Sequence, residues 1–298
     1  MNRFNPLRTR RSCLILLVAV EALAGVRAWA YESEIHQQLT FIAARQFNAC
    51  AQDRAGVERL SALDTRYIVK ANVAQADPNM FARMFRWSYY NRDDQTNRSA
   101  WGVIDTRFHE HFNDLSTNLQ QTEKHEQRLR LLGRLLSYIQ KVSSPSYAVP
   151  VFSGRWWRFS LGDRFNRFPV DAQAVEQAVA GRCTGLVASG STYKQVLVDT
   201  ADETVMAVQA PIFGFPATWE SYWRIADRPE EFGEYGRAGN SFGERTEFRC
   251  GEQERCLLLN NDPLYSEFAT QRHIAAVLAT MRALAILQHR QVPLQDPL

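Results

Sequence analysis

The sequence holds few of the short motifs that identify an enzyme class. It has no P-loop and no dinucleotide-binding fingerprint, and neither Gly154 nor Gly190-Ser191 belongs to a Gly-x-Ser-x-Gly nucleophile elbow. It also lacks internal repeats and low-complexity tracts. What is present, 45% apolar and 22% charged residues in 298, is typical of one large globular domain or two small ones.

An apolar run near the N-terminus is too short to span a membrane. It covers Cys13–Val20, follows Arg3, Arg8, Arg10 and Arg11, and precedes the small-residue signature Ala28-Trp29-Ala30. This pattern predicts a cleaved signal peptide over residues 1–30 and hence a periplasmic or secreted protein. The segment 9–14 also resembles a twin-arginine signal, and an ordinary basic segment stays open beside it. We divide the rest into a domain at 31–290 and a C-terminal tail at 291–298.

The mature chain has no excess of positive charge. Cleavage after residue 30 removes five arginines and one glutamate, so the formal charge falls from +3 to −1. The apparent basicity therefore belongs to the export signal. It gives no reason to expect a nucleic-acid partner.

Four cysteines remain after cleavage, and none of them forms a Cys-x-x-Cys pair. An even number in an exported chain favours two disulfides over a zinc–thiolate site, although both readings fit the count. Cys250 and Cys256 enclose only five residues and are expected to pair. That leaves Cys50 with Cys183.

Helical periodicity dominates the chain. Apolar residues recur at helical spacing in 34–47, 57–74, 79–90, 171–179 and 265–288, and 105–143 indicates two long helices around a break at 123–125. Residues 186–211 differ, because their valines alternate or cluster as β-strands favour. We therefore predict a single all-α domain with a small irregular or β insertion around 186–211.

Aromatic residues gather in two stretches of the sequence. They either line a groove for lipid headgroups or bases, or pack between helices, and packing is favoured. The set comprises Trp156, Trp157, Phe159, Trp219, Tyr222 and Trp223.

The stretch Leu132–Val151, LGRLLSYIQKVSSPSYAVPV, resembles the zinc-binding helix and loop of bacterial zinc-dependent phospholipases C and related zinc nucleases. The scaffold positions of that pattern are filled by Leu132, Gly133, Tyr138 and Pro145. The three positions where the family has ligands carry Ser137, Lys141 and Tyr147. The resemblance extends over most of 31–290 and implies the helical fold of that family.

Other ligand positions of the family are only partly filled. Tyr31, the first residue after cleavage, together with His36 and Asp77 match ligand positions and are the candidates for a residual metal site. His36 and Asp77 also fit ordinary roles, as a helix-start histidine and an Asp-Pro turn. Three further positions have lost their ligands: Ser88, Gly162 and Asn166. The losses therefore concentrate at ligands while the scaffold residues stay.

The resemblance thus implies an exported phospholipase C-like protein with a degenerate zinc site, a pseudoenzyme that binds a phospholipid headgroup, a nucleotide or a protein partner. No cofactor is expected, because Lys141 would repel a dication and could replace it beside Asp77. The alternative is a zinc-dependent phosphodiesterase with a reduced site, which would be a metal-dependent phosphoric ester hydrolase. A third reading is an interaction protein that pairs with an active homologue. A membrane surface is a candidate partner and nucleic acid is not.

Overall fold

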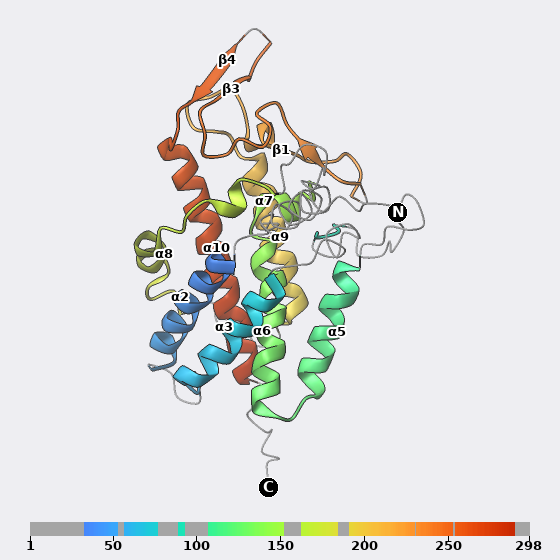
Figure 1. The fold of residues 1–298 in the computed structure, drawn as a ribbon, viewed down its shortest axis with the longest axis vertical. Helices are drawn as coiled ribbons and strands as arrows, with labels where there is room; N and C mark the ends of the chain where they lie inside the picture. The colour runs from blue at the N-terminus through green and yellow to red at the C-terminus, as the bar shows by residue number, and fades with distance from the viewer. Residues whose placement is uncertain are drawn as a thin grey trace, which may run out of the picture.

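The computed structural model describes residues 33–52, 57–76, 89–92, 107–151, 162–183, 191–229, 231–252 and 254–289. The described part is mostly helical, with short antiparallel strands (Figure 1). Its main helices are α2 (Ser33–Gln52), α3 (Ala62–Ala76), α5 (Phe108–Gln121), α6 (His125–Lys141), α8 (Ala172–Val179), α9 (Tyr193–Gln209) and α10 (Pro263–His289). Short helices are α7 (Pro145–Ala148), η2 (Phe165–Arg167) and η3 (Trp219–Ser221).

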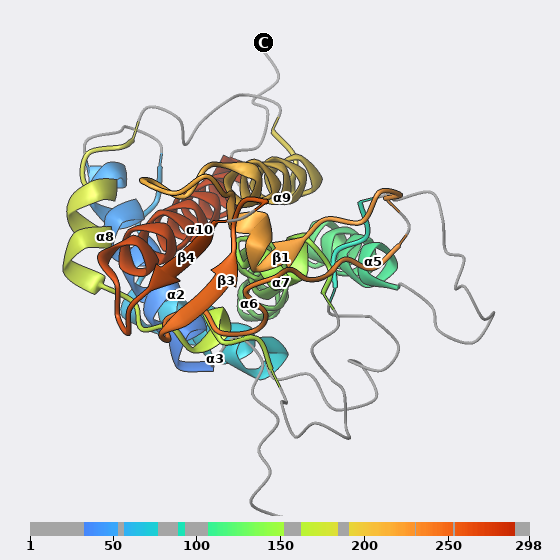
Figure 2. The ribbon, with the colours of Figure 1, turned by 90° about the horizontal axis from the view of Figure 1, so that it is seen from above.

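Helix α10 is the centre of the bundle. Seen from above, it lies between α9 on one side and α2 and α8 on the other (Figure 2), and it also contacts α6. Its sequence is apolar around most of the circumference, including Ala276, Val277 and Met281, all fully buried. A helix that is apolar on all sides is stable only when other elements surround it, which is the position of α10.

Helices α3 and α6 pack unusually closely because Gly133 has no side chain. A Cβ atom there would stand 2.2 Å from the Ile68 carbonyl oxygen and 2.9 Å from Ala71 Cβ. The contact distance is therefore set by a glycine in the middle of a helix. The glycine lowers helix propensity by about 1 kcal/mol relative to alanine, a cost that the close packing must offset.

Two small antiparallel pairs lie at the end of the molecule where α10 begins (Figure 1). Strand β1 (Trp223–Arg224) pairs with β2 (Glu234–Tyr235), and β3 (Thr246–Arg249) pairs with β4 (Arg255–Leu258). Beneath them lies an aromatic core in which the rings of Trp219 and Phe268 are 4.4 Å apart. Trp219, Tyr222 and Trp223 are all buried, which confirms packing for these three residues. Trp156, Trp157 and Phe159 lie outside the described residues.

Both expected disulfides are present. Cys50 at the end of α2 is bonded to Cys183 beyond α8, and Cys250 is bonded to Cys256 across the β3–β4 hairpin. Two disulfides are typical of proteins that fold in an oxidising compartment. Among the described helices, none is both long enough and apolar enough to cross a bilayer.

The prediction of a β insertion around 186–211 is wrong for residues 193–209. Residues 193–209 form α9, and the strands lie later in the chain. Buried residues of this segment recur every fourth position at Val196, Thr200, Thr204 and Val208, which is helical spacing. Thr192 begins the helix, since its hydroxyl accepts from the Gln195 amide at 3.1 Å. The β-favouring valines concealed this period.

The other expected helices that fall on described residues are confirmed. They correspond to α2, α3, α8 and α10, and α5 and α6 meet at the predicted break. The helix expected at 79–90 falls mainly on residues outside the described part, as do the signal peptide at 1–30 and the tail at 291–298.

Candidate functional site

His36 is fully buried on the inner face of α2. Its Nδ1 atom lies 2.6 Å from Gln140 Oε1 on α6, and because an amide oxygen only accepts, Nδ1 carries the proton. The pKa of His36 is lowered from 6.5 to about 3, mainly by burial and also by the charge of Lys141, while the hydrogen bond with Gln140 opposes both effects. The imidazole is therefore neutral at physiological pH.

Gln140 joins four helices through its side-chain amide. Oε1 accepts from His36 Nδ1 and, at 3.0 Å, from Asn72 Nδ2 on α3. Nε2 donates to Thr40 Oγ1 on α2 at 3.0 Å and to Thr280 Oγ1 on α10 at 3.1 Å. All five side chains are fully buried, and we call them the Gln140 network. Both acceptors and both donors of the amide are used, so the network adds specificity without leaving that amide unsatisfied.

Lys141 brings a positive charge to the edge of this network. It is 3% exposed, and its Nζ atom donates to the Gln75 carbonyl oxygen at 3.4 Å and stands 6.0 Å from the Tyr147 ring centroid. Ser137, one turn earlier on α6, is fully buried, and its hydroxyl has no hydrogen-bond partner among the described residues. Three of the positions at which the resembled family has ligands, Ser137, Lys141 and Tyr147, thus lie close to His36 or to one another.

Asn166 and Gly162 belong to a neighbouring group. Asn166 Oδ1 accepts from Ser144 Oγ at 2.6 Å, and its Nδ2 donates to Ser146 Oγ at 3.2 Å. The amide therefore fastens η2 to the loop around α7. The Gly162 carbonyl accepts from Asn240 Nδ2 at 2.8 Å, which ties it to the loop after β2 instead.

The described side chains around His36 do not fit a zinc ion. Zinc sites take histidine, cysteine or carboxylate ligands, usually four, or three with an open position. Nowhere in the described part do three or more such residues gather. The ammonium of Lys141, whose charge also lowers the pKa of His36, would repel a dication by several kcal/mol. We therefore derive no reaction step through a metal here.

Three of the predicted positions cannot be placed. Tyr31 and Asp77, the other candidates for a residual metal site, lie outside the described residues, as does the degenerate position Ser88. Whether these residues approach His36 therefore stays a prediction.

A second buried polar centre surrounds Asp163, which the sequence reasoning did not single out. Its Oδ2 accepts from Trp223 Nε1 at 2.8 Å and from Tyr235 Oη at 3.0 Å, and its Oδ1 accepts from the Phe165 amide at 2.9 Å. Burial raises the pKa of Asp163, while these hydrogen bonds oppose the rise. The carboxyl group holds η2 to β1 and β2, so its contacts are those of a structural anchor.

Residues 239–243, GNSFG, have the Gly-x-Ser-x-Gly pattern and were overlooked in the sequence. The segment lies in the loop between β2 and β3, whereas a nucleophile elbow needs a strand-to-helix turn. The Ser241 hydroxyl donates to the Ala238 carbonyl at 2.6 Å and accepts from Thr246 Oγ1 at 2.8 Å. These bonds make Ser241 part of the turn that leads into β3.

Sequence reasoning also missed Gln140, although a signal was available. Residues 132 and 136, eight and four positions before Gln140, are buried leucines of α6, so the glutamine continues an apolar stripe. A polar residue on a buried stripe needs internal partners. Asn72, four residues after the buried Ile68 of α3, gives the same signal.

Comparison of the chain with known protein families, curated proteins and solved structures gives no match.

Proposed function

We propose that the protein is an exported, phospholipase C-like helical protein that acts by binding and not by zinc catalysis. The Gln140 network is the observation that supports this proposal. It surrounds His36, the best candidate ligand in the chain, with uncharged amide and hydroxyl side chains, and the charge of Lys141 lies close enough to lower the pKa of the imidazole. The two disulfides support export to an oxidising compartment, with residues 1–30 as the proposed signal peptide.

In this proposal Lys141 supplies the positive charge that a metal ion gives to the related enzymes. Its ammonium already donates to the carbonyl of Gln75, and Asp77 follows two residues later in the sequence. An Asp77 carboxylate paired with Lys141 would neutralise the ammonium, provided that both groups are also hydrogen-bonded. The proposed ligand is a phospholipid headgroup, a nucleotide or a protein partner.

The proposal is tested by metal analysis and turnover assays on one preparation. Protein purified without chelator and equilibrated with zinc should contain far less than one zinc ion per chain. It should also leave phosphatidylcholine and single-stranded nucleic acid unhydrolysed. His36→Ala should not change the zinc content, and neither should His125→Ala, the matched control at an exposed histidine.

One result would overturn the proposal: stoichiometric zinc that is lost in His36→Ala, together with turnover abolished by a chelator. It would favour a zinc-dependent phosphodiesterase with a reduced site of Tyr31, His36 and Asp77. Copurification of a phospholipase C-like enzyme from the native host would instead assign the protein to the interaction class.

A further inference from the structure

A wide groove opens beside the two strand pairs, away from the Gln140 network. Its volume is about 850 Å³, and residues 216–227, the end of β2 and the end of β3 line it. Three arginines and three carboxylates face the groove: Arg224, Arg237, Arg249, Glu220, Asp227 and Glu234. The formal charges that line the groove therefore sum to zero, but only some of the arginines form an ion pair with a carboxylate.

Two of the arginines in and near the groove are already neutralised. Arg224 stands opposite Glu234 in the β1–β2 register, and their side chains form an ion pair at 2.9 Å. Arg255 on β4 pairs with Glu247 on β3 at 3.0 Å. Both carboxylates are thus engaged.

Arg237 and Arg249 are left without a carboxylate partner in the described part of the chain. Both Arg237 and Arg249 line the same groove. An anion bound between them would supply the counter-charge that no described carboxylate provides to these two side chains.

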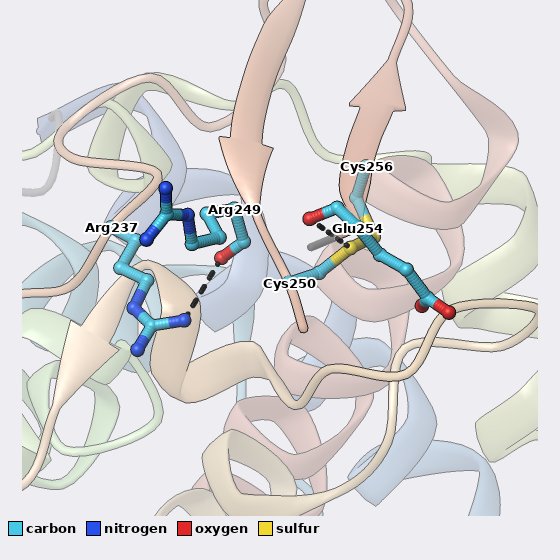
Figure 3. Close-up of a disulfide and its surroundings, with 5 residues drawn as sticks. All are labelled: Arg237, Arg249, Cys250, Glu254 and Cys256. Carbon is cyan, nitrogen blue, oxygen red and sulfur yellow. Dashed lines mark hydrogen bonds between the residues drawn. A yellow bond between two sulfur atoms is a disulfide. The ribbon is translucent and has the colours of Figure 1, made fainter. Parts of the chain in front are cut away.

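Hydrogen bonds and a disulfide restrain the backbone that carries Arg237 and Arg249. Arg237 Nη1 donates to the Arg249 carbonyl oxygen at 3.3 Å, and Figure 3 shows both guanidinium groups on the same side of β3. Arg249 precedes Cys250, whose disulfide to Cys256 closes the hairpin. On the other side, the Ala238 amide donates to the Ser221 carbonyl at 2.7 Å, which fixes the chain next to Arg237. Such constraints reduce the entropy lost when a ligand binds.

We propose that Arg237 and Arg249 form a binding site for a single phosphate group. Guanidinium groups bind phosphate through planar pairs of N–H donors, and a phosphate has enough oxygens for two arginines, whereas a carboxylate has two. Glu220 and Asp227 in the same groove repel a second anionic group. The site therefore fits a phosphate monoester or a lone headgroup and disfavours a polyphosphate chain such as nucleic acid.

This inference rests on the proposed binding role, because a protein that acts by binding needs a site outside its closed core. The two can still fail separately. Zinc in the core would overturn the proposed function and leave the arginine pair intact. Failure of phosphate binding would overturn the site and leave the zinc analysis unchanged.

The test is a calorimetric titration of the full chain with inorganic phosphate, at an ionic strength that screens non-specific attraction. Arg237→Ala and Arg249→Ala should each weaken binding about tenfold or more, because each removes charge-assisted hydrogen bonds. Arg255→Ala is the matched control: it is exposed on the same hairpin but paired with Glu247, and should leave the affinity within about twofold. Circular dichroism checks that each variant folds.

Two arms identify the source of the phosphate. Glycerol phosphate tests a soluble ligand, and vesicles with phosphatidylglycerol test a lipid headgroup. Binding in either arm that inorganic phosphate displaces, and that both arginine variants lose, supports the site and names its source. No binding of phosphate by the unaltered protein, or equal losses in all three variants, would overturn it.

Discussion

Acid should destabilise this protein well above the pH at which carboxylates titrate, because two histidines are buried in the neutral form. The pKa of His36 is lowered to about 3 and that of His273 to about 4, in both cases mainly by burial. Both have a value of 6.5 when exposed, so below pH 6.5 the unfolded chain binds protons that the folded chain refuses. The stability that the two neutral histidines contribute is fully present above pH 6.5 and is lost as the pH falls toward their pKa values in the folded protein.

The magnitude follows from the two pKa values of each histidine. Each pH unit below 6.5 costs about 1.4 kcal/mol per histidine until the folded pKa is reached. Between pH 7 and pH 5, therefore, each histidine removes about 2 kcal/mol and the pair about 4 kcal/mol. That loss is a large fraction of the 5–15 kcal/mol typical of folded domains.

The substitution His36→Asn separates the contribution of His36 to the pH dependence of stability from that of the other titrating groups. The asparagine amide nitrogen can replace Nδ1 as donor to Gln140 Oε1, but it does not titrate. Urea unfolding followed by circular dichroism at pH 7 and pH 5 should show a loss of about 4 kcal/mol in the unaltered protein and about 2 kcal/mol in the variant. The raised pKa of Asp163 acts in the opposite direction in both proteins and cancels in the comparison.

His125→Asn, at a histidine that is 59% exposed and bonded to Asp64, is the control and should retain the full loss. Equal pH dependence in His36→Asn and the unaltered protein would refute the assignment of a neutral, buried imidazole at position 36.

Two further predictions concern stability. Gly133→Ala should lower the free energy of unfolding by about 2 kcal/mol, because the new methyl group meets the Ile68 backbone oxygen, which cannot rotate away; an unchanged urea midpoint would contradict the close contact of α3 and α6. Replacing Cys50 and Cys183 by serine should cost about 5 kcal/mol, since this disulfide closes 133 residues of chain. Opening the hairpin disulfide, which closes six, should cost about 2 kcal/mol. Similar losses for the two would contradict this dependence on loop length.

Much of the helical fold was predictable because burial follows the period of the helix. The long helices α6 and α10 were found within a few residues of their ends. Helix α9 was wrongly predicted as β structure for a physical reason. Valine favours strands, and this preference outweighed the helical spacing of the buried residues in the prediction. The disulfide pairs were predictable because Cys250 and Cys256 lie close together in the sequence, which favours a bond between them and leaves Cys50 to pair with Cys183.

The candidate site was less predictable because its partners come from distant parts of the chain. His36 was identified from its position in the sequence, but nothing in its local sequence indicates the amide oxygen, 104 residues away, that accepts a hydrogen bond from its ring. Asp163 was missed for the same reason: two of its partners, Trp223 and Tyr235, follow 60 and 72 residues later. Long-range polar pairs have no sequence period, so a single chain does not indicate them.

The residues that match the scaffold positions of the resembled family each have a structural role that needs no metal. Gly133 permits the close approach of α3 and α6, and Pro145 occupies the first position of α7, where its ring fits a helix start. The Tyr138 ring lies 4.9 Å from the ring of Phe108 on α5, and burial raises its pKa to about 12. Substitution at any of these positions would disturb packing whether or not zinc binds.

The ligand positions are under no such constraint. Once a metal is gone, a buried position near His36 accepts any side chain whose polar atoms find partners or whose charge is balanced. Lys141 meets that condition, because its ammonium donates to the Gln75 carbonyl oxygen, whereas the Ser137 hydroxyl has no partner among the described residues. Packing alone therefore explains the residues that match the scaffold of the resembled family. The metal assay on His36→Ala, and not the pattern of residues, separates a retired metal site from a helical bundle that never held one.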